Sequence, residues 1–238
     1  MRGSIIQIAT QAAAELGLPV PTEIATSVDQ TSIQLRALLN SAINELTLYY
    51  DWQFLLKMAT ITTVNGQATY DHPSDFGRML NRTLWSSSSA LPTAGPVSPA
   101  GWQRLVSGIG TIGPFSMYRI VGNQIEFLPV PGEDGLVFNY QYISNTPIES
   151  YLTPGTFTSL IVHDEDSPLF DYWLLVKLLK LKMWQAKGLD TSSLVNDFAR
   201  LMDAFTGQDH GAPVLSLTAR PRSHLLSNFN VPDGSWQT

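Results

Sequence analysis

The chain has 238 residues, a formal net charge of −6 and no cysteine, with 44% hydrophobic and only 14% charged residues. The net negative charge excludes a nucleic-acid binder held by bulk positive charge, and the lack of cysteine excludes disulfides, thiolate metal sites and a cysteine nucleophile. Soluble domains carry roughly 25% charged residues. The sparsely charged surface therefore suits burial against neighbouring subunits. Polar residues interrupt every apolar stretch, so we expect no signal peptide and no membrane span.

Two helices are predicted at the N-terminus. Ser4 and Gln7 have the spacing of a capping box, apolar residues recur at helical spacing to Leu16, and a glycine follows as a stop signal. A second helix is predicted from near Thr31, with a glutamine three residues later, to about 51–52. The short polar linker between them predicts antiparallel neighbours.

The middle of the chain has the pattern of antiparallel strands. Residues 58–64 and 68–70 predict a hairpin around Asn65-Gly66. Further strands are predicted at 80–85, at 117–121 and 124–128 around a Gly122-Asn123 turn, and at 136–143, where Phe138, Tyr140 and Tyr142 share one face. Residues 86–99 are rich in serine, proline and glycine and predict an exposed loop.

Helical patterns return near the C-terminus. Ser167-Pro168 is predicted to begin a helix that runs to Lys187, and the acidic residues 164–166 would favour its positive end. The last helix is predicted at about 190–207. Residues 208–238 show no period and predict an extended tail.

The predicted fold class is α+β: a four-helix bundle built from both chain ends, an inserted and mostly antiparallel β-lobe, and an extended C-terminal tail. The predicted boundaries are 1–57 for the N-terminal helices of the bundle, 58–160 for the β-lobe with its exposed loop 86–99, 161–207 for the C-terminal helices, and 208–238 for a tail that docks on a partner.

Motif analysis predicts no catalytic site, no cofactor and no bound metal. His163 and the three acids after it are consecutive, so they cannot easily converge on one ion, and no histidine spacing matches a zinc motif. Gly-x-Ser-x-Gly and phosphate-cradling motifs are absent. Residues 108–113 fit the bare Gly-x-Gly-x-x-Gly pattern, but Pro114 and a strand follow where a helix would be required, so we interpret them as a loop.

Several segments, taken in order, are together typical of one protein family. They are Ala14–Pro21, Leu38–Ala42 with Asp51–Leu55, Tyr70–Phe76, Tyr118–Ile120 with Gly122–Ile125 and Leu128–Pro131, and Asp164–Asp166 with Pro168-Leu169 and Lys187–Asp190. Over most of the chain they resemble the podophage head-to-tail adaptors, also called tail tubular protein A or tail accessory factors. The match departs at His72, where that family tends to place leucine.

The resemblance implies a structural virion protein and not an enzyme. It implies a homo-oligomeric, dodecameric ring at the head–tail junction of a short-tailed phage, assembled in the host cytoplasm. The implied partners are further copies of the chain, the portal protein, the tail nozzle protein, and double-stranded DNA that passes through the lumen without sequence-specific binding. No membrane is involved. The ring would help retain packaged DNA and form the channel for genome ejection, and an acidic lumen would let the DNA slide.

Two sets of residues are candidates for partner binding. Lys177, Lys180 and Lys187 lie on similar helix faces and could contact an acidic portal surface or DNA phosphate, although a solvated face is the preferred interpretation. The tail set is Arg220, Arg222, Leu225, Leu226, Phe229 and Trp236. We predict that this segment becomes ordered on a partner, because contacts there would offset the entropy of ordering.

Two alternatives stay open from the sequence. A virion-associated peptidoglycan hydrolase would need a carboxylate pair, for which Asp71, Asp75 and Glu126 are available. A stopper or tail completion protein would occupy another level of the tail.

Overall fold

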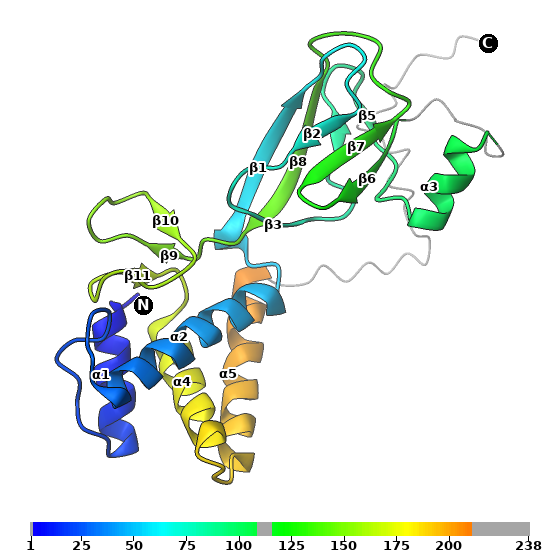
Figure 1. Ribbon diagram of the computed structural model, residues 1–238. Helices are drawn as coiled ribbons and strands as arrows, with labels where there is room; N and C mark the ends of the chain where they lie inside the picture. The colour runs from blue at the N-terminus through cyan, green and yellow to red at the C-terminus, as the bar shows by residue number, and fades with distance from the viewer. Residues whose placement is uncertain (1, 109–115, 211–238) are drawn as a thin grey trace, which may run out of the picture. The chain divides into compact units, whose positions relative to one another are not determined.

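The computed structural model describes residues 2–108 and 116–210 (Figure 1). Contacts divide these residues into two compact units, a helical unit of residues 2–56 and 144–210 and a β-lobe of residues 57–143. The fold is mixed α+β, and both chain ends contribute to the helical unit. Residues 144–160, placed in the β-lobe by the sequence analysis, belong to the helical unit.

The N-terminal helices begin at side-chain caps. Helix α1 (Ile5–Leu16) has the predicted capping box, because Ser4 and Gln7 each accept a backbone N–H from the other, and it ends at a left-handed Gly17. Helix α2 (Gln30–Tyr49) begins at Asp29 and not at Thr31. The Asp29 carboxylate accepts the N–H groups of the first turn, and an aspartate is a strong N-cap.

The start of the next long helix differs from the prediction. Ser167–Pro168 forms strand β11, which pairs with Ile148–Glu149, and helix α4 (Tyr172–Ala186) begins at the N-cap Asp171. Two capping signals lie four residues apart, and a long-range strand pairing occupies the first. The predicted stop is confirmed, because Lys187 is the C-cap residue of α4.

The last helix, α5 (Ser192–His210), is longer than predicted. The sequence analysis ended it near Gly207, but residues 208–210 continue the helix. Asp209 accepts the Gln53 N–H at 2.8 Å, which holds this last turn against the residues after α2. The rest of the predicted tail, from residue 211, lies outside the described residues.

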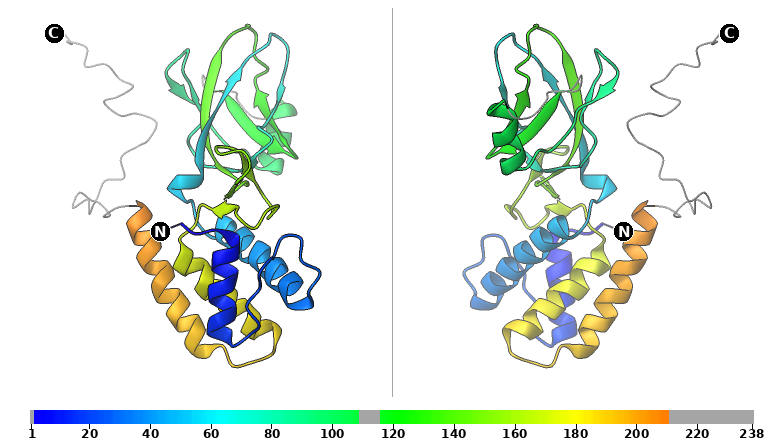
Figure 2. Two further views of the ribbon diagram at one scale, coloured as in Figure 1. Left: turned by 90° about the vertical axis from the view of Figure 1, so that its left-hand side faces the viewer. Right: turned by 90° about the vertical axis from the view of Figure 1, so that its right-hand side faces the viewer.

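Helix α4 is the centre of the helical unit. It packs against α1, α2 and α5, and in Figures 1 and 2 it lies between α1 and α5. Its buried residues are Leu174, Leu175, Val176, Leu178, Leu179, Leu181 and Met183. A helix with apolar residues on most of its sides must be covered by other elements, because those residues are otherwise exposed to water. By contrast, α5 packs mainly on α4, and of its described hydrophobic side chains Met202 is the buried one.

The strands form three antiparallel sheets. In the helical unit, β9 (Ile148–Glu149) pairs with β10 (Phe157–Thr158) and β11. The five-stranded sheet of the β-lobe has the order β1-β8-β4-β5, with β3 also paired to β8; these are β1 (Leu56–Thr62), β3 (Phe76–Met79), β4 (Trp85–Ser86), β5 (Leu91–Pro92) and β8 (Val137–Ser144). The third sheet has the order β2-β7-β6, from β2 (Thr69–Asp71), β6 (Met117–Val121) and β7 (Gln124–Leu128).

The β6–β7 hairpin is confirmed, but the first predicted hairpin is wrong. The turn at Asn65-Gly66 forms, yet β1 pairs with β8 and β2 pairs with β7. The turn is held by distant residues, since Asn65 N–H donates to Asp134 and Gly66 N–H donates to Pro131. The turn was therefore predicted correctly from its local residues, whereas the pairing of the strands depended on long-range packing.

The predicted strand 80–85 is also wrong. Strand β3 ends at Met79 and β4 begins at Trp85, with a turn between them in which Arg82 has a positive φ of 64°. The predicted exposed loop 86–99 is exposed from residue 87 to 91, but Pro92 and Thr93 are buried. Helix α3 (Pro99–Val106) follows it and was not predicted.

The core of the β-lobe is aromatic. Phe138, Tyr140 and Tyr142 point inward from β8, as their alternation predicted, and pack with Tyr118 and Phe127 of the other sheet. Burial raises the pKa of Tyr118 and of Tyr140 to about 12. These phenols therefore stay neutral and contribute apolar area to the lobe.

Candidate partner-binding surfaces

The acidic turn Asp164–Asp166 is a structural hydrogen-bond centre. Asp166 is fully buried, and its carboxylate accepts the backbone N–H groups of Tyr151, Val162 and His163 at 2.7–3.0 Å. Asp164 accepts the N–H groups of Ile24 and Ala25, both at 2.8 Å. The predicted role at a helix start is therefore wrong. The carboxylates hold three loops together beside α1.

The acidic residues of the hydrolase alternative each have a separate partner. Asp71 accepts from Gln124 at 2.8 Å, Glu126 pairs with Arg119 at 2.6 Å, and Asp75 pairs with Lys57. Among residues 2–108 and 116–210 there is no group of three or more histidines and acids that could hold a metal ion. Of the Gly-x-Gly-x-x-Gly segment, all but Gly108 lies outside the described residues.

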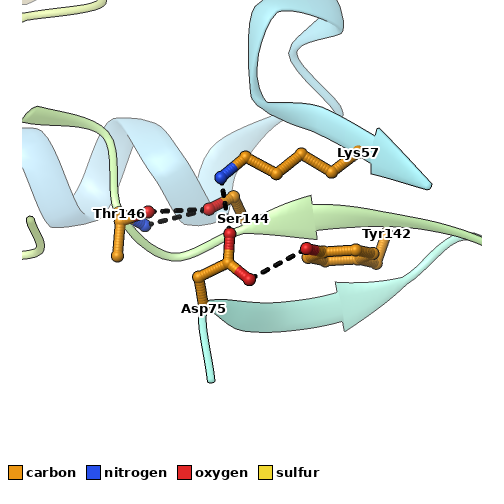
Figure 3. Close-up of polar contacts among 5 residues, drawn as sticks. All are labelled: Lys57, Asp75, Tyr142, Ser144 and Thr146. Atoms are coloured by element: carbon orange, nitrogen blue, oxygen red, sulfur yellow. Dashed lines mark hydrogen bonds and ion pairs between the residues drawn. The ribbon is translucent and has the colours of Figure 1, made fainter. Parts of the chain in front are cut away.

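Asp75 joins the strand that enters the β-lobe to the strand that leaves it (Figure 3). Its two carboxylate oxygens accept from Lys57 Nζ at 2.6 Å and from the Tyr142 hydroxyl at 2.8 Å. Burial, and then the hydrogen bond to Asp75, raise the pKa of Tyr142, so the phenol keeps the proton that it donates. Directly after β8, Thr146 N–H donates to Ser144 Oγ and forms a tight turn. The two contacts of Asp75 therefore hold the first and last strands of the β-lobe together.

The lysines of α4 do not form one solvent face. Lys180 pairs with Glu15 of α1 at 2.5 Å, and Lys182 pairs with Glu45 of α2. The hydrogen bond from Lys180 holds the pKa of Glu15 below its usual value. Lys177 is half-buried, and Lys187 is exposed at the end of α4. Lys180 therefore holds helices together, while partner contacts by Lys177 and Lys187 stay a prediction.

A groove of about 350 Å³ opens at the end of α5. Its lining residues are Arg2, Trp52, Phe54, Leu169, Asp171, Phe205, Gln208 and Asp209, and we call it the α5 groove. The residues come from the chain start, the short 3-10 turn Gln53–Leu55, the N-cap of α4 and the last turns of α5. Sequence reasoning missed this site because its residues are far apart along the chain.

The floor of the α5 groove is rigid and aromatic. Trp52, Phe54 and Phe170 pack on one another with ring centroids 5.3–5.6 Å apart, and Trp52 Nε1 donates to the Leu46 carbonyl at 2.7 Å. Trp52 is 2% exposed, whereas Phe54 is 37% exposed. The groove thus offers part of an aromatic surface to a partner.

A second pocket of about 350 Å³ shares Arg2 with the α5 groove. It is lined by Gly3, Gln7, Gln11, Tyr172 and Trp173. Trp173 is 48% exposed and makes an edge contact with Tyr172. A Cβ at Gly3 would meet the Tyr172 ring at 2.5 Å, so only glycine lets the chain pass so close. Aromatic residues in such partly open positions are typical anchors of protein interfaces.

The tail residues predicted to bind a partner cannot be placed. Arg220, Arg222, Leu225, Leu226, Phe229 and Trp236 all lie outside the described residues. Their role stays a prediction from the sequence.

Comparison with known proteins assigns the family. No curated protein matches the chain. In the part of the chain that the structure describes, no helix is long and apolar enough to cross a membrane. The model of the SU10 adaptor protein family matches residues 4–215, which includes both the helical unit and the β-lobe. The predicted resemblance to phage head-to-tail adaptors is confirmed, and the chain belongs to the SU10 adaptor protein family.

Proposed function

We propose that the protein is one subunit of a ring that joins the portal to the tail nozzle of a short-tailed phage. The family match supports a structural adaptor of the virion. The ring, its twelve-fold composition, the retention of packaged DNA and the channel for ejection are parts of the proposal. Assembly in the host cytoplasm precedes incorporation at the head–tail junction.

The incomplete cover of the helical unit carries this proposal. On α5, Leu194, Phe198, Leu201 and Phe205 stay partly exposed, and Val195 is 43% exposed. In the region of β9–β11, Tyr151, Leu152 and Leu160 are each more than 60% exposed. Clustered apolar side chains of this kind mark interaction sites. The helices would act as a four-helix bundle that packs against lateral neighbours and the portal.

The pairing of cationic side chains supports a lumen that does not hold DNA. Lys57, Arg119, Lys180 and Lys182 all pair with carboxylates in the same chain. With a net charge of −6 in each copy, a ring would be acidic overall, and an acidic channel repels phosphate. Unpaired cations that bind phosphate would slow ejection.

The same contacts disfavour the hydrolase alternative. Asp71, Asp75 and Glu126 are each held by a different partner, whereas glycosidases use two carboxylates that face one bond. We therefore propose no catalytic role. Incubation with purified cell wall would contradict this if it released muropeptides.

Electron microscopy of the full-length protein, with and without purified portal, tests the proposal. We expect closed rings seated coaxially on the portal. A stopper or tail completion protein at another level of the tail would bind the nozzle and not the portal. A protein that stays monomeric and does not bind the portal would overturn the proposal.

A further inference from the structure

We propose that α2 of one copy packs across the uncovered side of α4 in a second copy, so that the helical units of neighbouring subunits contact each other front to back. The surface on α2, called the α2 face, consists of Ile33, Ala37, Ser41, Asn44 and Leu48. The surface on α4, called the α4 stripe, consists of Trp173, Lys177 and Trp184. The inference rests on the proposed function, because it names the contact between neighbouring subunits of the ring.

Helix α4 is covered on three sides by described helices. Lys180 pairs with Glu15 of α1, and Lys182 pairs with Glu45 of α2. Helix α5 also packs on α4, and α1 and α5 pack on α4 rather than on each other. At about 100° per residue, the α4 stripe lies roughly opposite Lys182. The stripe therefore faces away from α2, between α1 and α5.

The α4 stripe is aromatic at both ends and cationic between them. Trp173 is 48% exposed and Trp184 is partly exposed. The two residues are separated by about 16 Å of helix. Lys177 makes no hydrogen bond or ion pair in the part of the chain that the structure describes, although its charge acts on Glu15. Open tryptophans of this kind are typical anchors of protein interfaces.

The α2 face is uncharged. Its residues recur every three or four positions, so they form one line along about four turns of the helix. Among the 20 residues of α2 only Arg36 and Glu45 are charged, and Arg36 donates to the Ala25 carbonyl. A helix side that stays in water normally carries charged residues. The small side chains of Ala37 and Ser41 also let a bulky partner approach closely.

The charges beside the two surfaces are complementary. Glu45 lies next to the α2 face, and its side chain is 59% exposed although it pairs with Lys182. An antiparallel arrangement of α2 on the second copy's α4 brings Glu45 opposite Lys177. It also places Leu48 over Trp173, because each of these residues lies about one turn from the charged one. The exposed charges are then paired and the exposed indole is covered.

The two surfaces lie on opposite sides of one compact unit. Helix α2 packs on α4 with its buried side and crosses in front of α4 in Figure 1, so the α2 face points away from α4. A chain cannot bring its own two surfaces together. If two copies paired through their α2 faces, the contact would be two-fold and would stop at a dimer. A contact between different surfaces repeats from copy to copy and can close a ring.

The absence of cysteine allows a crosslinking test in which one chain carries both thiols. Asn44→Cys and Lys177→Cys are combined in the full-length protein, which is mixed with purified portal and oxidised. These positions lie on opposite sides of α4, so a disulfide between them joins two copies. We expect a ladder of multimers on a denaturing gel. The matched control combines Asn44→Cys with Asn196→Cys, exposed on α5, and should give about tenfold less multimer, because docking raises the local thiol concentration.

Three outcomes separate the inference from its rivals. Equal multimer yields from the two pairs would overturn it. Dimers from Asn44→Cys alone, without multimers from Asn44→Cys with Lys177→Cys, would show that α2 pairs with α2 and would also overturn it. Closed rings on the portal without the ladder would refute this inference alone, whereas a ladder without portal binding would refute the proposed function alone.

Charge variants of the cysteine-free protein add a second readout. Ser41→Arg places an unpaired charge in the middle of the α2 face, and we expect at least a tenfold loss of portal-bound rings in sedimentation. Asn196→Arg, on the exposed side of α5, is the matched control. Lys177→Gln should lower the ring fraction several-fold. Circular dichroism checks that each variant is folded. A ring fraction that Ser41→Arg leaves unchanged would contradict the inference.

Discussion

The two units of the protein differ in how completely they cover their own apolar residues. In the β-lobe, two sheets enclose an aromatic cluster that includes Tyr118 and Phe127, each at most 1% exposed. In the helical unit, α4 is covered on most sides by other helices, but α5 leaves residues such as Phe205 partly exposed. The β-lobe buries its apolar residues by itself, whereas exposed apolar side chains such as those of α5 are typical of interaction sites. The difference supports the proposal that the helical unit makes the contacts of assembly.

Truncating an aromatic residue in each unit is the strongest test of this difference. Phe127→Ala should lower the free energy of unfolding of the β-lobe by about 3–5 kcal/mol, because it empties a filled core. Phe205→Ala on α5 should cost about 1 kcal/mol in the isolated protein, because less area leaves water. Urea titration followed by circular dichroism measures both. Equal losses would show that α5 is as well packed as the lobe.

Asp166→Ala should come next in size and should act on the helical unit. The change removes the acceptor of three backbone N–H groups, so we expect a loss of about 3 kcal/mol in the free energy of unfolding. Glu165→Ala, at the exposed neighbouring position, should have little effect. Amide hydrogen exchange would show which unit loses stability. Faster exchange throughout the β-lobe would contradict the separation of the two units.

Removing an ion pair between helices should have a smaller effect. Lys180→Gln breaks the contact to Glu15 of α1, where the lysine side chain is 14% exposed. We expect a loss of about 1 kcal/mol in the free energy of unfolding. The pKa of Glu15 should rise toward its ordinary value, which NMR titration can follow. An unchanged Glu15 titration would refute the pairing.

The smallest expected effect is a pH dependence of the stability of the β-lobe. His72 is buried, stacks on Phe76 at 3.8 Å and bonds to the Tyr140 hydroxyl at 2.8 Å. Burial lowers the pKa of His72 below its ordinary 6.5, although the charge of Asp71 opposes this shift. The folded lobe therefore keeps the neutral ring while the unfolded chain takes up a proton. Stability from this residue is complete above pH 6.5 and falls as pH drops toward the lower, folded pKa.

His72→Leu should remove that part of the pH dependence. The stability of each variant would be compared by urea titration at about pH 7.5 and about pH 5.5. His163→Gln serves as the control, because His163 lies in the helical unit. Identical pH slopes for the wild type and His72→Leu would contradict the buried neutral histidine.

Local signals in the sequence predicted local structure well. The capping box at Ser4 and the β6–β7 hairpin were predicted because their stabilising contacts lie within a few residues. The hairpin at Asn65-Gly66 and the helix start at Ser167 were wrong, because distant partners decided both. The α5 groove was not predictable, since Arg2, Trp52 and Asp209 meet only after folding.

The role of the acidic turn Asp164–Asp166 also depended on distant residues that local sequence patterns do not reveal. Consecutive acids suggested electrostatics at a helix start, but Asp166 is fully buried among backbone donors. Only the folded loops supply those N–H groups. An aspartate looks the same in the sequence whether its carboxylate is buried or solvated. Only the folded structure shows which of the two it is, and a buried carboxylate must accept hydrogen bonds.

The central claim is that copies of this chain form the ring between portal and nozzle. A cryo-electron microscopy reconstruction of the intact virion tests it most directly. The account predicts a ring of density that fits the helical unit and the β-lobe, coaxial with the portal, with α5 of each copy facing its neighbour. Density for the chain away from the tail axis, or single copies with α5 facing solvent, would contradict it.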